Sequence, residues 1–65
     1  MKIDTRRLYI MLAEKGMTKK DIAERGGISQ QSVSTAFRRG TCSPPTVGKI
    51  ARGLGVPVVD IIKEV

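Results

Sequence analysis

The sequence predicts an all-α fold of five short helices in a single domain, residues 1–65. Two observations favour it. Residues suited to begin a helix recur along the chain, each before apolar residues at helical spacing, and glycines follow these stretches. The composition is 40% hydrophobic and only 3% aromatic, which predicts a small aliphatic core. Because a chain this short buries only about 60% of its unfolded surface, we expect modest stability unless it dimerises.

The first helix is expected to begin at Asp4 and to end at Gly16. Leu8, Met11 and Leu12 follow the i, i+3, i+4 spacing of one buried helix face.

Arg6 and Arg7 fall in the first turn of this helix, where the helix dipole disfavours cations. Their position suggests contact with an external anion such as phosphate. Solvated surface arginines are the equally weighted alternative.

The second and third helices follow closely. Thr18 is the expected cap of the second helix, with Asp21 in its first turn, and Ser29 is the cap of the third. Gly26 and Gly27 lie between them, where a positive φ is easily adopted. The spacing is that of a helix-turn-helix, in which the two helices cross closely.

The outer face of the third helix carries neutral amides, hydroxyls and one guanidinium, groups that read base edges in duplex DNA. A polar solvent-exposed face is the simpler alternative, but the absence of carboxylates beside paired basic residues argues against it. The expected base-reading residues are Gln30, Gln31, Ser34, Thr35 and Arg38.

The chain resembles the Cro/cI-type (Xre-like) helix-turn-helix repressors, whose DNA-binding domain is a lambda-repressor-like bundle of five helices. The resemblance is carried by Lys19, Ile22, Ala23, Gly27, Ile28, Gln30, Gln31, Val33 and Ser34, and continues through Pro44, Ile50, Ala51 and residues 54–62. It implies double-stranded DNA as partner, helix three in the major groove, and a homodimer at least on DNA. The expected phosphate contacts are Lys19, Lys20, Ser29, Arg39, Arg6 and Arg7.

Two departures from the family pattern stand out. The family commonly pairs an arginine in helix one with a glutamate late in helix three, where this chain has Leu12 and Phe37. We hypothesise that an apolar contact replaces the ion pair, an exchange that is often neutral or stabilising when the pair is buried. An apparent extra residue also precedes Gly40, which leaves the correspondence of Arg38 and Arg39 open by one position.

The fourth helix is expected to begin after Ser43 as cap, with Pro44 at its first position, and to stop at Gly55. Cys42 is interpreted as a small apolar packing residue rather than a redox thiol. Pro57 is expected to open a short fifth helix. The apolar residues around it form either a dimer surface or part of the core: Val56, Val58, Ile61, Ile62 and Val65.

The net charge of +6 favours an anionic partner, which agrees with DNA. There is no histidine and no Gly-rich phosphate loop, so we expect no enzyme activity, metal, cofactor or small-molecule ligand. The lack of a long apolar run predicts no membrane association and a cytoplasmic protein. The resemblance implies a nucleoid-associated protein of bacterial or phage origin. The alternative function is a helical protein-interaction module, such as an antitoxin or adaptor.

Overall fold

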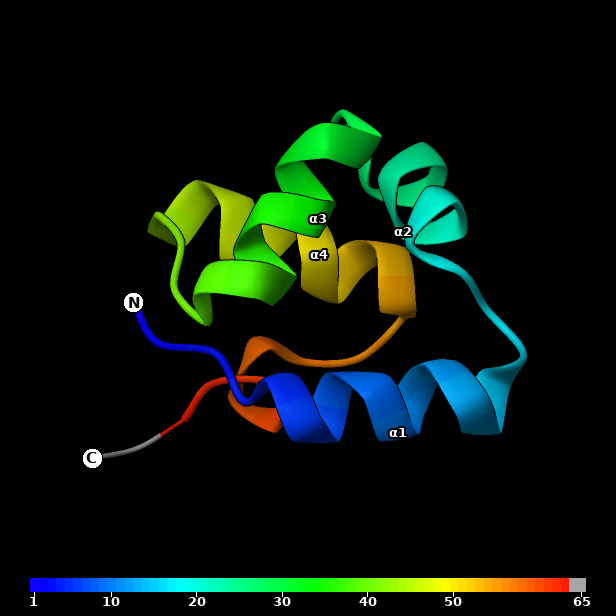
Figure 1. Cartoon of the computed structure of the whole chain (residues 1–65), viewed down its shortest axis with the longest axis horizontal. Coiled ribbons are helices and arrows are strands. Elements are labelled where there is room, and N and C mark those ends of the chain that lie inside the picture. The colour runs from blue at the N-terminus through cyan, green and yellow to red at the C-terminus, as the bar shows by residue number, and fades with distance from the viewer. Residues whose placement is uncertain (64–65) are drawn as a thin grey trace.

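The computed structural model describes residues 1–63. The elements in this part of the chain are α1 (Thr5–Lys15), α2 (Lys19–Gly26), α3 (Gln30–Arg39), α4 (Pro44–Leu54) and a 3-10 turn, η1 (Val58–Asp60). α3 lies over α4 with α2 beside them, and α1 runs along the opposite side of the molecule (Figure 1). The predicted all-α class is confirmed.

Three of the four expected side-chain caps are formed. Asp4, Thr18 and Ser29 each accept a hydrogen bond from a backbone N–H in the first turn of the helix that follows. At α2 the cap is reciprocal, because Asp21 Oδ2 accepts from the N–H of Thr18 at 2.9 Å. Gly27 follows with φ +73°, the left-handed conformation that ends α2 and turns the chain into α3.

The fourth cap differs from the expectation. Ser43 occupies the N-cap position of α4, but its hydroxyl pairs with Thr46 Oγ1 at 3.0 Å and makes no capping bond to the backbone. Pro44 and Pro45 follow it directly, and their fixed φ suits the first turn of a helix, where the missing N–H costs little. Proline preorganisation therefore starts this helix in place of a side-chain cap.

Helices α2 and α4 touch backbone to backbone through two glycines. A Cβ placed on Gly26 would overlap the carbonyl oxygen of Lys49. A Cβ on Gly53 would come within 2.5 Å of the carbonyl oxygen of Ile22. This crossing sets the depth at which α2, and with it α3, sits on α4.

The core is aliphatic apart from one phenylalanine, as the composition predicts. Side chains from all four helices and from both chain ends contribute to it. The buried hydrophobic residues are Ile3, Leu8, Met11, Ile22, Ala23, Val33, Ala36, Phe37, Val47, Ile50, Ala51, Leu54 and Ile61.

The segment before α1 is extended and pairs on both sides through isolated β-bridges. On one side the N–H of Ile3 donates to the carbonyl of Gly40 at 3.0 Å, in the loop after α3. On the other side the N–H of Asp4 donates to the carbonyl of Ile61 at 2.8 Å. The beginning of the chain therefore lies between the α3–α4 loop and the segment after η1 (Figure 1).

The expected fifth helix is reduced to the single turn η1. The reason is the pairing just described. After η1 the backbone turns to meet the segment before α1, so that Ile62 bridges Ile3 and the N–H of Lys63 donates to the carbonyl of Lys2 at 3.0 Å. Backbone groups engaged in this way cannot extend a helix.

The apolar residues of this region divide between core and surface. Ile61 is 0% exposed, so its assignment to a dimer surface was wrong for the protomer described here. Val56, Val58 and Ile62 are half-buried and pack against the core, and Val65 lies outside the described residues. Val59, which was not among the expected dimer residues, is 72% exposed.

Candidate nucleic-acid interface

The exposed face of α3 forms the centre of the candidate site. Val33, Ala36 and Phe37 are buried beneath it. At 3.6 residues per turn the positions farthest from this stripe are Gln31, Thr35 and Arg38, and Gln30 and Ser34 follow on one flank. The structure therefore brings all five expected base-reading residues to one continuous face. Gln30, Gln31 and Arg38 are exposed, whereas Ser34 and Thr35 are half-buried.

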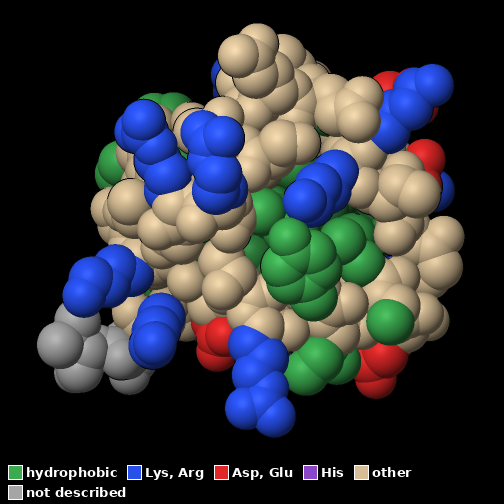
Figure 2. Space-filling model, viewed as in Figure 1, with side chains coloured by type: hydrophobic (Ala, Val, Ile, Leu, Met, Phe, Trp, Pro, Cys, Tyr) green, Lys and Arg blue, Asp and Glu red, His purple; other side chains and the backbone are tan. Residues whose placement is uncertain are grey.

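The flank of α3 nearer to α1 is occupied by Lys19, the first residue of α2. Its Nζ lies 5.2 Å from the ring centroid of Phe37 and 5.3 Å from that of Tyr9. The two rings meet edge to face, with centroids 5.2 Å apart and planes at 85°. Figure 2 shows this apolar patch between α1 and α3 with a basic side chain against it.

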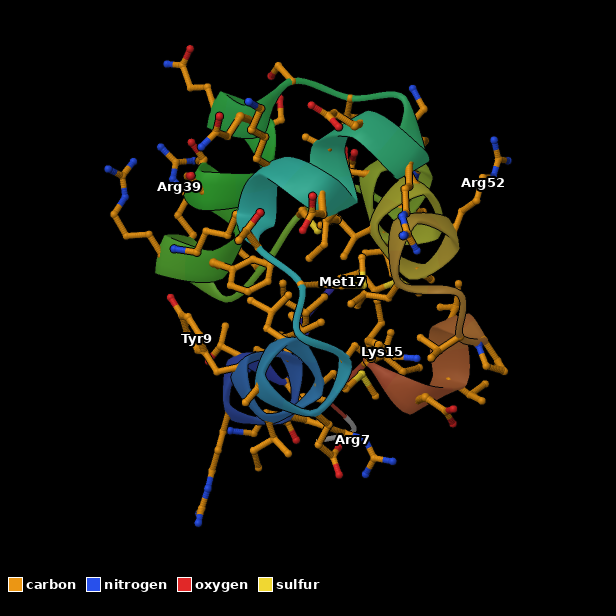
Figure 3. All side chains as sticks on the ribbon, turned by 90° about the vertical axis from the view of Figure 1, so that its right-hand side faces the viewer. Arg7, Tyr9, Lys15, Met17, Arg39 and Arg52 are labelled. Carbon is orange, nitrogen blue, oxygen red and sulfur yellow. The ribbon has the colours of Figure 1, made fainter. Side chains whose placement is uncertain are left out.

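The other flank is a polar hollow of about 360 Å³ between α3 and the start of α4. Arg39 stands at this hollow and points to the same side of the molecule as Tyr9 (Figure 3). The rest of the lining is rich in hydroxyls, which can donate to phosphate, although the Thr41 hydroxyl donates its proton to the carbonyl of Met1 at 2.9 Å. The lining residues are Ser29, Gln31, Ser32, Thr35, Ala36, Arg39, Thr41, Cys42 and Thr46.

The hydroxyl of Ser29 is already used within the helix start. It accepts the N–H of Ser32 at 3.1 Å and donates its own proton to Ser32 Oγ at 2.8 Å. Ser29 therefore has no hydroxyl proton left for a phosphate in this arrangement, whereas the proton of Ser32 remains available. Ser32 is exposed and replaces Ser29 as the better donor candidate.

The remaining basic candidates are not all gathered here. Arg6 is exposed and lies three residues before Tyr9, which places both on the same side of α1. Arg7 points away from α3, on the side of α1 opposite Tyr9 (Figure 3). Lys20 is exposed on α2 and contributes to the electrostatics of Asp21.

The carboxylate of Asp21 is held in its charged form. The hydrogen bonds from the backbone N–H and the side chain of Thr18 lower the pKa of Asp21 below its ordinary value of 3.8, and Arg25 and Lys20 lower it further. The start of α2 is thus fixed at neutral pH, and Lys19 projects from that fixed turn.

Cys42 is half-buried and packs against the core, as expected for a small apolar residue. Burial raises the pKa of its thiol above the ordinary 9.0, although the N-terminal ammonium group opposes the shift. Thiolate chemistry at neutral pH is disfavoured. Among residues 1–63 no three His, Cys, Asp or Glu side chains come together as metal ligands. No helix in that part of the chain is long and apolar enough to cross a bilayer.

Comparison with protein families gives one decisive match: a family model described as helix-turn-helix covers residues 8–61. The chain belongs to the Cro/cI-type (Xre-like) helix-turn-helix family. It is accordingly a DNA-binding helix-turn-helix domain, of a family of regulators rather than enzymes. Comparison with the curated proteins and with the solved structures returns no match.

Phe37 stands at one of the two positions where the resemblance implied an ion pair, and the structure shows what it contacts instead. Its ring packs edge to face on Tyr9 and carries the ammonium of Lys19. Leu12, the other departing position, is half-buried against the core. The hypothesis of a direct contact between Leu12 and Phe37 stays a prediction.

Sequence reasoning missed four residues that line or border this candidate site. Ser32 carried a usable signal, since it stands three residues after a cap serine, where a hydroxyl can meet the cap. Tyr9, Thr41 and Thr46 carried none, because each reaches the site from a separate element.

Proposed function

We propose that this protein binds double-stranded DNA sequence-specifically and represses transcription, with α3 in the major groove of a roughly palindromic operator. The observation that carries the proposal is the form of α3. It is a ridge of amides, hydroxyls and one guanidinium with a basic residue on each flank, Lys19 on one and Arg39 on the other. A helix in the major groove has a phosphate strand on either side, which is the charge pattern this ridge complements.

The roles divide by position. Gln31, Thr35 and Arg38, at the crest of the ridge, would contact base edges, with Gln30 and Ser34 contacting the adjoining bases. Lys19, Ser32 and Arg39 would contact phosphates, joined at the periphery by Lys20 and Arg6. Arg7 is left out because it points away from α3 (Figure 3).

Two copies are proposed to meet on the operator, with half-sites about one helical turn apart. A single helix of this size reads only a few base pairs, so pairing of copies supplies the missing specificity. The proposed contact surface uses Val58 and Ile62, which are half-buried in the protomer, together with the exposed Val59.

Selection of bound duplexes from a random DNA pool, at low and at physiological salt, tests the proposal. Enrichment of a two-fold symmetric motif with half-sites one turn apart is the expected result. Binding that enriches no motif and disappears as salt rises would leave only non-specific phosphate attraction. That outcome would move the search to an acidic protein partner, as for an antitoxin or adaptor.

A further inference from the structure

The ammonium of Lys19 is held at a junction of three helices. Lys19 begins α2, Tyr9 belongs to α1 and Phe37 to α3. The Nζ of Lys19 lies 5.3 and 5.2 Å from the two ring centroids, inside the roughly 6 Å range of cation–π attraction. Phe37 is only 3% exposed and forms a rigid base, while Tyr9 is 49% exposed and forms the outer wall.

This junction faces the same way as the exposed side of α3. Tyr9 reaches from α1 toward α3 and points to the side on which Arg39 also stands (Figure 3). Around the axis of α3, Phe37 lies next to Gln30 and Ser34. Lys19, which sits against Phe37, is therefore beside the edge of the ridge that these two residues form.

A lysine side chain that is free in water loses rotamer entropy when a phosphate fixes it. The two rings already restrict Lys19, so less freedom remains to be lost on binding. The rings cover only part of the ammonium, because Lys19 is half-buried rather than buried. Its remaining N–H donors are open to an anion.

We propose that Tyr9 is a positioning residue for DNA binding, which together with Phe37 presents the Lys19 ammonium to the phosphate backbone. The inference rests on the proposed function, since it takes duplex DNA as the partner. Helix α1 would thus contribute to DNA binding through Tyr9 although none of its residues contacts a base. Sparing part of the ordering cost of the Lys19 side chain corresponds to about two- to fivefold in affinity.

The first experiment needs no DNA. Ring currents of Tyr9 and Phe37 should move the Lys19 ε-methylene proton resonances upfield in the NMR spectrum of the wild-type protein. Tyr9→Leu should reduce that shift and Tyr9→Phe should keep it. If the Lys19 ε-methylene protons of the wild type resonate where those of an unfolded chain do, the rings do not hold Lys19 and the inference is wrong.

The second experiment measures affinity for the selected duplex and for a random one. Tyr9→Leu should weaken both about two- to fivefold, whereas Tyr9→Phe should bind as the wild type does. In a Lys19→Ala background Tyr9→Leu should have no further effect, because the two residues act as a unit. Ile10→Ala is the matched control, since Ile10 is 50% exposed on the same helix.

Three outcomes would overturn the inference. An equal loss from Tyr9→Leu with and without Lys19 would mean that Tyr9 acts independently of Lys19. Tighter binding by Tyr9→Leu would mean that the rings hold Lys19 away from the phosphates. Wild-type protein that binds no duplex would remove the proposed function as well, whereas binding without coupling would remove this inference alone.

Discussion

The hydroxyl of Ser29 donates its proton to the hydroxyl of Ser32, with the two oxygens 2.8 Å apart. Because of this bond the two serines at the start of α3 have different roles, one in capping the helix and the other in donating a hydrogen bond outward. Ser29 also accepts the N–H of Ser32 and so caps the helix, while Ser32 keeps a proton that it can donate outward.

We therefore expect opposite phenotypes from the two alanine variants. Ser29→Ala should lower the free energy of unfolding by about 1 kcal/mol, because a helix cap is lost. Ser32→Ala should leave stability nearly unchanged and weaken DNA binding on all sequences alike. Urea unfolding and binding to a random duplex measure the two effects. A Ser32→Ala protein that binds DNA normally would remove Ser32 from the proposed interface.

Base reading by α3 is tested at its crest. Gln31→Ala should cost about 1–3 kcal/mol on the selected duplex and relax the preference at one base position, while binding to random DNA stays the same. Competition between duplexes that differ at single positions gives this readout. Equal losses on selected and random DNA would show that Gln31 does not read sequence.

Phosphate contact is tested by two arginines, each in the last turn of its helix. Arg39 stands on the α3 side of the molecule and Arg52 points to the opposite side (Figure 3). Arg39→Ala should reduce the slope of log affinity against log salt by about one, and Arg52→Ala should leave it unchanged. Equal slopes for the two variants would mean that charge alone, without position, governs binding.

The crossing of α2 and α4 predicts contrasting effects at two glycines of one helix. Gly53→Ala should destabilise the fold by about 1–3 kcal/mol or more, because its Cβ would meet the carbonyl oxygen of Ile22 at 2.5 Å. Gly48→Ala should be stabilising by about 0.5–1 kcal/mol, since a Cβ there would meet no atom within 4 Å beyond the adjoining backbone of α4, and alanine favours the helix. Thermal or urea unfolding of both variants checks the pair, and similar effects at the two sites would contradict the close crossing.

The cap of α2 predicts a pH dependence of stability. The pKa of Asp21 is lowered in the folded state by its bonds to Thr18, so folding favours the carboxylate. The resulting stabilisation is complete above the unfolded value near 3.8 and is lost as the pH falls through the lower folded pKa. Asp21→Asn should therefore be less stable than the wild type at pH 7, and the difference should shrink in this acid range. A difference that is constant with pH would rule out the charge as its source.

The local features of the fold could be predicted because their causes lie within a few residues. The caps Thr18 and Ser29 and the turn at Gly27 depend on neighbours that the sequence places beside them. The outer face of α3 followed from helical spacing alone. Ser43 was wrong as a side-chain cap, because its hydroxyl pairs with Thr46 Oγ1 and makes no bond to the backbone.

The features that could not be predicted depend on distant segments. The fifth helix is shortened by pairing between Ile62 and Ile3, which no local pattern reveals. The contact of Tyr9 with Lys19 depends on how α1 is rotated about its axis, and hydrophobic spacing does not determine rotation that finely. Ile61 carried the same apolar signal as its neighbours, and only the packed core distinguishes it from a surface residue.

The extended segment before α1 joins parts of the protein that are far apart along the chain. The N–H of Ile3 donates a hydrogen bond to Gly40, which directly follows Arg39, and the N–H of Asp4 donates one to Ile61. Fraying of the first residues would consequently release the loop that follows α3 and the closing segment of the core in the same event. Amide hydrogens at both pairings should then exchange with solvent at a common rate. Local opening at the start of the chain would in this way also loosen the backbone beside the proposed DNA-binding surface.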